Sequence, residues 1–145
     1  MDYIREAIEQ LEHYNELVLS LANMRDQLEA LKLERYGIKA QIITREPKGS
    51  GKSEPDDKWV NNIFNRNILV RNIEATSKKI NCIDKALSVL NNDERLVLKR
   101  MFITGNHNAI EDICRELSLS QSQIYRIKGQ AIRRFARAMY GVGVA

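Results

Sequence analysis

The sequence predicts an all-α protein, with a long N-terminal helical hairpin followed by a C-terminal domain of shorter helices. Apolar residues recur every three or four positions over residues 2–45 and again over 59–90, which is the spacing of helices that pack along a seam. Residues 46–58, rich in Gly, Pro and charge, separate these two runs and predict a loop. Residues 91–140 then carry shorter amphipathic patterns divided by turn residues.

The first run predicts one long helix over residues 2–45. Its apolar positions alternate three and four residues apart, as in the seam of a coiled coil, with an interruption at Arg25. The seam positions are Ile4, Ala7, Leu11, Tyr14, Val18, Leu21, Leu28, Leu31, Ile38 and Ile42.

The second run predicts a helix that continues through Leu90 and has polar residues within its seam. Such residues cost stability but can fix register and oligomeric state. The apolar seam positions are Trp59, Ile63, Val70, Ile73, Ile80 and Leu87, and the polar ones are Arg66, Ser77 and Asp84. Two helices joined by a short polar loop fold back most simply as a hairpin, although one or both could pair between subunits. Residues 1–90 are therefore expected to form an oligomerisation arm.

The loop contains Gly51-Lys52-Ser53, which is the end of a phosphate-binding motif. The full motif needs a glycine five residues earlier, where this chain has Glu46, and it must lie between a buried strand and a helix. A carboxylate at that position would repel phosphate, and a helical pattern precedes the loop. We therefore expect a solvated linker, no enzymatic activity and no cofactor. ATP hydrolysis that is abolished by Lys52→Ala would reverse this expectation.

Charge is distributed unevenly along the chain, whose net charge is +4. Residues 1–46 hold six basic and nine acidic side chains, whereas residues 121–140 hold five basic and none acidic. A purely basic final helix predicts a polyanionic partner, most often nucleic acid. No apolar run suits a membrane span or a signal peptide, so a cytoplasmic location without a membrane partner is expected. Histidines and cysteines are not at ligand spacing, so no metal is expected.

The C-terminal domain, residues 91–140, is expected to begin with a helix capped by Asn92 or Asp93. The buried face of this helix is predicted to consist of Leu90, Val97, Leu98, Met101 and Phe102. The elements expected after it are a turn at 104–108, a helix over 109–117, a turn at 118–120, a helix from Gln121 to about Tyr140, and a frayed tail over 141–145.

Residues 109–135 have the layout of a helix-turn-helix. Its core positions would be Ile110, Ile113 and Leu117 in the first helix, Leu119 in the turn, and Ile124, Ile127, Ala131 and Phe135 in the second helix. Ser120 would cap the second helix, and Gln123 would complete a capping box. The opposite face of that helix would be free to enter a major groove, and it carries no acidic residue. This face consists of Gln121, Ser122, Tyr125, Arg126, Gly129, Arg133 and Arg137.

Residues at the start of a recognition helix approach base edges. Gln121 suits adenine and Arg126 suits guanine, whereas Ser122 and Tyr125 could touch bases or phosphates. Phosphate contacts are expected from Lys128, Arg133, Arg134 and Arg137. Simpler alternatives stay open: Gln123 could serve only as a cap, Tyr125 could cover an apolar edge, and the later arginines could form an ordinary solvated face.

The stretches LSVLNNDERLVLKRMF at 87–102 and IEDICRELSLSQSQIYRIKGQAIRRF at 110–135 resemble region four of sigma factors, which recognises a promoter element. Cys114 departs mildly from this pattern, because a small residue is usual there. The base-reading positions of region four fall on Gln121, Ser122, Gln123, Tyr125 and Arg126. Most of these side chains differ from those of sigma factors, so the resemblance implies a different DNA target.

The whole chain is similar to small phage late-gene transcriptional regulators of the RinA/ArpU type. The matches are PKGS at 47–50 and QIYR at 123–126. The resemblance implies a DNA-binding activator of phage late genes, such as those for packaging and morphogenesis, in the cytoplasm of a bacterial host cell. The partners expected are double-stranded DNA, further copies of the chain, and possible contact with RNA polymerase.

Two other functions share the same local features. A small terminase-like subunit would use the DNA-binding module for genome packaging, and a large ring of subunits would favour it. An interaction protein would bind RNA polymerase without reading DNA, and polymerase binding that survives Arg126→Ala in a chain without DNA affinity would favour it.

Overall fold

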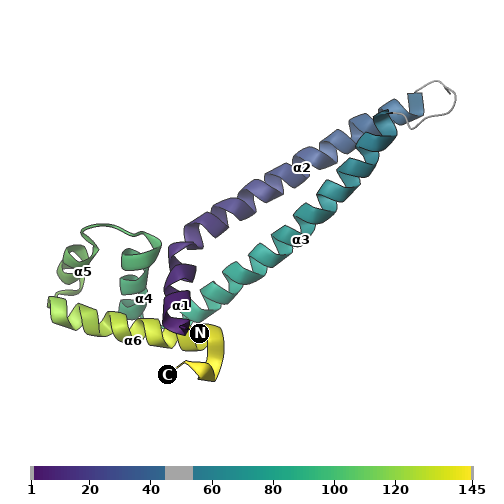
Figure 1. The fold of residues 1–145 in the computed structure, drawn as a ribbon. Coiled ribbons are helices and arrows are strands. Elements are labelled where there is room, and N and C mark those ends of the chain that lie inside the picture. The colour runs from purple at the N-terminus through teal and green to yellow at the C-terminus, as the bar shows by residue number, and fades with distance from the viewer. Residues whose placement is uncertain (1, 45–53, 145) are drawn as a thin grey trace. The chain divides into compact units, whose positions relative to one another are not determined.

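The computed structural model describes residues 2–44 and 54–144, and these residues form helices and turns without a strand. The all-helical prediction is therefore confirmed. The elements are α1 (Tyr3–Glu12), α2 (Tyr14–Thr44), α3 (Glu54–Ser88), α4 (Asn92–Leu98), the π-helix η1 (Lys99–Ile103), α5 (Ala109–Leu117), α6 (Gln121–Tyr140) and the 3-10 helix η2 (Gly141–Gly143) (Figure 1). The chain divides into two compact units: the first contains described residues 2–18 and 78–144, and the second 19–44 and 54–77.

The long N-terminal helix expected over residues 2–45 is interrupted once. His13 has φ −91° and ψ 0°, so α1 ends there and α2 begins at the next residue. The interruption is local, because the His13 amide donates to the Glu9 carbonyl at 3.1 Å and the Leu17 amide to the His13 carbonyl at 3.0 Å. The apolar spacing continues across this point, so periodicity alone could not reveal the break.

The last five residues of the loop expected at 46–58 are helical. Residues 54–58 already belong to α3, with Pro55 in the first turn, where a missing backbone N–H breaks no helical hydrogen bond. The Gly51-Lys52-Ser53 sequence lies outside the described residues.

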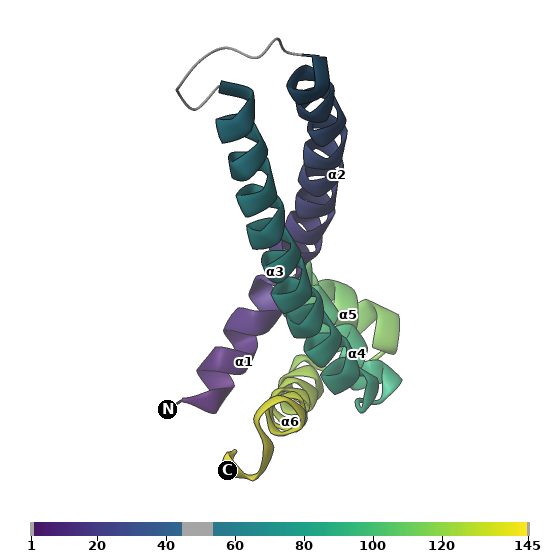
Figure 2. The same cartoon turned by 90° about the vertical axis from the view of Figure 1, so that its right-hand side faces the viewer.

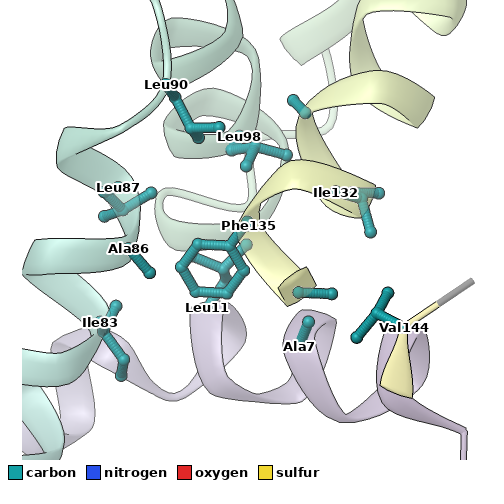
Figure 3. Close-up of a cluster of buried hydrophobic side chains, with 12 residues drawn as sticks. Ala7, Leu11, Ile83, Ala86, Leu87, Leu90, Leu98, Ile132, Phe135 and Val144 are labelled. Atoms are coloured by element: carbon teal, nitrogen blue, oxygen red, sulfur yellow. The ribbon is translucent and has the colours of Figure 1, made fainter. Parts of the chain in front are cut away.

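The first unit is built around one cluster of buried side chains, here called the main core (Figure 3). Its members come from α1, the end of α3, α4 and α6, and they converge around Phe135, which is fully buried. They are Ala7, Leu11, Ile83, Ala86, Leu87, Leu90, Leu98, Ala131, Ile132, Phe135, Ala136 and Val144. Residues 2–18 and 78–90, which the sequence assigned to the arm, are thus part of the same compact unit as the C-terminal helices.

The C-terminal tail, expected to fray, is packed against this unit as far as it is described. Val144 is only 6% exposed and belongs to the main core. The ring of Tyr140 lies 5.5 Å from that of Tyr3, so the end of α6 packs beside the start of α1 (Figure 2). A Cβ on Gly143 would lie 3.3 Å from the Tyr3 ring, so the glycine allows this close approach. A tail of small residues has no helical periodicity, and its burial left no signal in the sequence.

Because the hydroxyl of Tyr140 is buried, we expect it to make the stability of the fold depend on pH. Its oxygen is buried without a hydrogen-bond partner among the described residues, and burial, followed by the charges of Glu6 and Glu9, raises the pKa of Tyr140 above 10.0. Since desolvating an unpaired hydroxyl is unfavourable, Tyr140→Phe should leave the free energy of unfolding unchanged or raise it by up to about 1 kcal/mol near neutral pH.

The sign of the pH effect follows from the raised pKa. The folded state favours the neutral phenol, so its contribution is complete below pH 10 and is lost as pH rises through the folded pKa. Urea unfolding at about pH 8 and about pH 11 should show a smaller alkaline loss in Tyr140→Phe than in the parent. Tyr125→Phe, at an exposed position, is the matched control, and an equal effect in both variants would contradict the assignment.

In the second unit, α2 and α3 run side by side in opposite directions (Figures 1 and 2). Their contacts occur in reverse sequence order. The Arg35 guanidinium lies 5.8 Å from the centre of the Trp59 ring, and Asn62 Nδ2 donates to the Leu31 carbonyl at 2.9 Å. Among the described residues of this unit, only Ile38 and Asn62 are buried.

In this unit the seam expected in α3 is displaced by one residue at two of its positions, whereas Trp59 and Ile73 are half-buried as expected. Ile63 and Val70 were expected to be buried but are 36% and 41% exposed, whereas Asn62 is only 3% exposed. Burial of Asn62 is possible because its amide donates to α2 and its Oδ1 accepts from Arg66 Nε at 2.8 Å. In the first unit, Val18 of the expected α2 seam is exposed as well.

Candidate nucleic-acid interface

The helix that leads into the candidate interface is capped by Asn91, not by Asn92 or Asp93. The Asn91 side chain accepts from the Glu94 amide at 2.8 Å, and the Glu94 carboxylate accepts from the Asn91 amide at 3.4 Å. This reciprocal arrangement is a capping box, and a glutamate three residues after Asn91 was the sequence signal for it.

The buried face expected for this helix is largely present, but the helix changes type along its length. Leu90, Val97 and Leu98 are buried, whereas Met101 and Phe102 are half-buried. The last two lie in η1, whose wider turn is closed by a 2.8 Å bond from the Thr104 amide to the carbonyl of Lys99, five residues earlier.

The segment α5–turn–α6 has the boundaries that the sequence predicted. Ser118 takes a left-handed conformation with φ 54°, and the Leu119 amide donates to the Cys114 carbonyl at 3.2 Å, which ends α5 within one residue. The turn places Leu119 against a second core, formed by buried Val97, Ala109, Ile113 and Ile124 with half-buried Met101, Cys114, Leu117, Leu119 and Ile127. Ile110, also expected at the core, is half-buried.

The capping box expected at the start of α6 is confirmed. Ser120 Oγ accepts from the Gln123 amide at 3.4 Å, and Gln123 Oε1 accepts from the Ser120 amide at 2.9 Å. Because its side-chain oxygen is engaged in the cap, the geometry favours a capping role for Gln123 over a role in reading bases.

The buried stripe of α6 is wider than the sequence analysis proposed. Ile124, Ala131 and Phe135 are fully buried and Ile127 is half-buried, as expected. Ile132 and Ala136 are buried as well, and they were missed. These two residues are four apart, a spacing that marks a second apolar row, and α6 needs it because it packs on α1 as well as on α4 and α5.

The opposite side of α6 is exposed along its length, except at Gly129, which is half-buried. At its N-terminal end, Gln121, Ser122, Tyr125 and Arg126 are all exposed, and we call these four residues the reading face. Tyr125 is 49% exposed, so about half of its surface is open to solvent. Arg133 and Arg137 are exposed further along, and no acidic residue occurs in α6.

Lys128 lies beside the reading face but is held by aromatic rings. Its ammonium group is 5.6 Å from the centre of the Phe102 ring in η1 and 5.7 Å from that of Tyr125. A cation over a ring face is attracted by the ring quadrupole. Lys128 therefore helps to orient Tyr125 and brings positive charge next to it.

Arg134, expected to contact phosphate, has a different place in the structure. Its guanidinium donates from Nη1 to the Glu94 carboxylate and from Nη2 to the Val89 carbonyl, the latter at 2.9 Å. The Glu94 side chain is only 5% exposed, so Arg134 neutralises a buried charge. Arg133 and Arg137 make no ion pair with any described residue and remain open to an outside anion.

The described residues contain no cluster of His, Cys, Asp or Glu that could hold a metal ion. None of the helices described is both long enough and apolar enough to cross a membrane.

Comparison with known families places the chain in a group that is associated with phages. Residues 38–136 match the family described as protein of unknown function (DUF1492), and the chain belongs to this family. The match extends from the end of α2 almost to the end of α6 and so includes the candidate interface. Neither a curated protein nor a solved structure matches the chain.

Proposed function

We propose that the chain is a sequence-specific DNA-binding regulator of transcription, in which α5 and α6 act as a helix-turn-helix. The observation that carries this proposal is the exposed reading face at the N-terminal end of α6, supported from behind by the second core. A helix presented in this way can enter a major groove with its first turns against base edges.

Each exposed residue has a chemical task in this proposal. Gln121 can pair with adenine through its amide, and Arg126 can donate two hydrogen bonds to guanine. Ser122 and Tyr125 contact bases or the backbone beside them. Positive charge from Lys128 and the free guanidinium of Arg133 supports phosphate contacts, which raise affinity without sequence preference. Gln123 and Arg134 support the shape of the module.

The biological setting is proposed from the resemblance to late-gene regulators and from the phage-associated family. The chain would activate late or packaging genes in the cytoplasm of a bacterial host, without a cofactor. Further copies of the chain would pair through the second unit, because two linked readers bind repeated half-sites more tightly than one. RNA polymerase would be a further partner at the promoter.

The proposal is tested by binding of the purified chain to fragments of its source genome and to unrelated DNA over a series of salt concentrations. One fragment should bind about a thousandfold more tightly than the others. Arg126→Ala should weaken that binding by about 10- to 100-fold and leave binding to unrelated DNA nearly unchanged. Arg71→Ala, an exposed arginine of the second unit, is the matched control.

Two outcomes would count against this assignment in different ways. Uniform, salt-sensitive binding that Arg126→Ala does not change would remove α6 as the recognition helix. A preferred fragment at a packaging site, instead of upstream of late genes, would favour a small terminase-like recognition subunit that uses the same module.

A further inference from the structure

The second unit buries too little apolar surface to be complete by itself. Only Ile38 and Asn62 are buried among its described residues. In contrast, large apolar side chains are exposed at Leu19, Leu33, Tyr36, Ile43, Val60, Ile63, Phe64, Ile68 and Val70. A long helix is stabilised mainly by burying one face against other elements, and a pair of helices provides only a narrow contact. Further helices are needed to cover this unit.

The positions at which α2 and α3 face each other are fixed by two contacts. Leu31 lies opposite Asn62, through a 2.9 Å hydrogen bond, and Arg35 lies opposite Trp59. Each step of one residue turns an α-helix by about 100°. In two right-handed helices that run in opposite directions, a step forward from the facing position turns both helices toward the same side of the pair.

Four exposed apolar residues lie on this one side. Tyr36 follows the facing residue Arg35, and Ile63 follows the facing residue Asn62. Ile43 and Val70 lie seven residues beyond Tyr36 and Ile63, which is about two turns along the same side of each helix. We call Tyr36, Ile43, Ile63 and Val70 the apolar side of the second unit.

The other side of the pair is independently marked by a groove. It is lined by the facing residue Leu31 and by residues that precede facing positions, as Ala30 precedes Leu31, and its volume is about 420 Å³. The groove is lined by Gln27, Ala30, Leu31, Asn65, Ile68 and Leu69. Of the residues that line the groove, only Ile68 is a large apolar residue that is exposed, whereas the apolar side has four.

Charge on the apolar side determines how a second copy can approach. Lys32 follows the facing residue Leu31, and Arg25 and Lys39 lie seven residues before and after it, so α2 carries an exposed basic row on this side. On α3, Glu74 lies one turn beyond Val70 and is exposed. If α2 of one copy packed against α2 of the other, the two basic rows would repel each other. If α2 of one copy packs against α3 of the other, the basic row faces the side of α3 that carries Glu74, and this repulsion is avoided.

We propose that two copies of the chain pack through their apolar sides, with α2 of each copy against α3 of the other, as a four-helix bundle. The bundle covers the four residues of the apolar side and leaves Phe64 and Leu33, on the outer faces of the helices, in solvent. This surface would provide the pairing of copies that the proposed function requires. The inference of a dimer rests on the proposed function only for the role of the dimer.

The test uses the full chain in analytical ultracentrifugation over a range of concentrations. The parent should sediment as a dimer, and Ile63→Lys should raise the dimer dissociation constant at least about 100-fold, because it places charge in the interface. Phe64→Lys is the matched control: this neighbouring residue is 63% exposed, and the change should alter dissociation by less than about 3-fold. Helix content measured by circular dichroism checks that both variants fold.

The outcomes separate this inference from the proposed function. A monomeric parent, a large ring, or equal dissociation in the two variants would overturn the apolar-side dimer, whether or not the chain reads DNA. Dissociation by Ile63→Lys alone, in a chain without DNA preference, would support the dimer and refute the DNA-reading function. If both hold, Ile63→Lys should keep single half-site binding and lose the tighter binding to paired half-sites.

Discussion

Replacing Phe135 by alanine should lower the free energy of unfolding by about 3–5 kcal/mol. Phe135 is fully buried at the centre of the main core, where side chains from α1, α3, α4 and α6 meet (Figure 3). Removal of the ring loses its transfer free energy and leaves a cavity that helices from four parts of the chain cannot easily close. Urea denaturation followed by circular dichroism measures this loss.

The matched control for this change is Tyr125→Ala, which removes an exposed aromatic ring from the same helix. It should cost less than about 1 kcal/mol, because it removes only exposed surface and the contact with Lys128. Similar losses in the two variants would mean that Phe135 does not hold the core together. A large loss of DNA affinity in Tyr125→Ala without loss of stability would match the proposed reading face.

Local signals in the sequence were sufficient to place α5 and α6. Ser120 and Gln123 are three residues apart and cap α6, and the apolar period predicted most of its inner face, although it missed Ile132 and Ala136. The docking of α1 was not predictable in the same way. Ala7 and Leu11 fit the seam of a coiled coil as well as they fit a globular core, and periodicity does not reveal which partner buries them.

The differences from expectation in α3 and at the candidate site have related physical causes. A hydrophobic pattern favours Ile63 over Asn62 for the inner face, but tertiary hydrogen bonds to Leu31 and Arg66 permit burial of the polar residue. Arg133 and Arg134 are likewise indistinguishable in the sequence. A buried carboxylate forty residues away, on Glu94, gives Arg134 a structural partner, and only the fold brings the two together.

Arg134→Ala should therefore destabilise the chain by about 2–3 kcal/mol, whereas Arg133→Ala should change stability by less than about 0.5 kcal/mol. Loss of Arg134 leaves the Glu94 carboxylate buried with the capping amide of Asn91 as its remaining partner. The expected loss is below that for a fully buried pair, because the Arg134 side chain is 47% exposed and water can partly replace it.

A double-mutant cycle with Glu94→Gln measures the pair directly, and urea unfolding should give a coupling energy of about 1–2 kcal/mol for Arg134. The same cycle with Arg133 should give none. The two arginines should have the opposite ranking in their effects on DNA affinity. Arg133→Ala should weaken binding to all sequences and reduce the slope of log affinity against log salt concentration by about 1. Folded Arg134→Ala should bind DNA nearly as the parent does. A guanidinium that is paired with a buried carboxylate is expected to bind a second anion only weakly. Equal effects of the two arginines on DNA affinity would therefore show that Arg134 leaves Glu94 to contact phosphate.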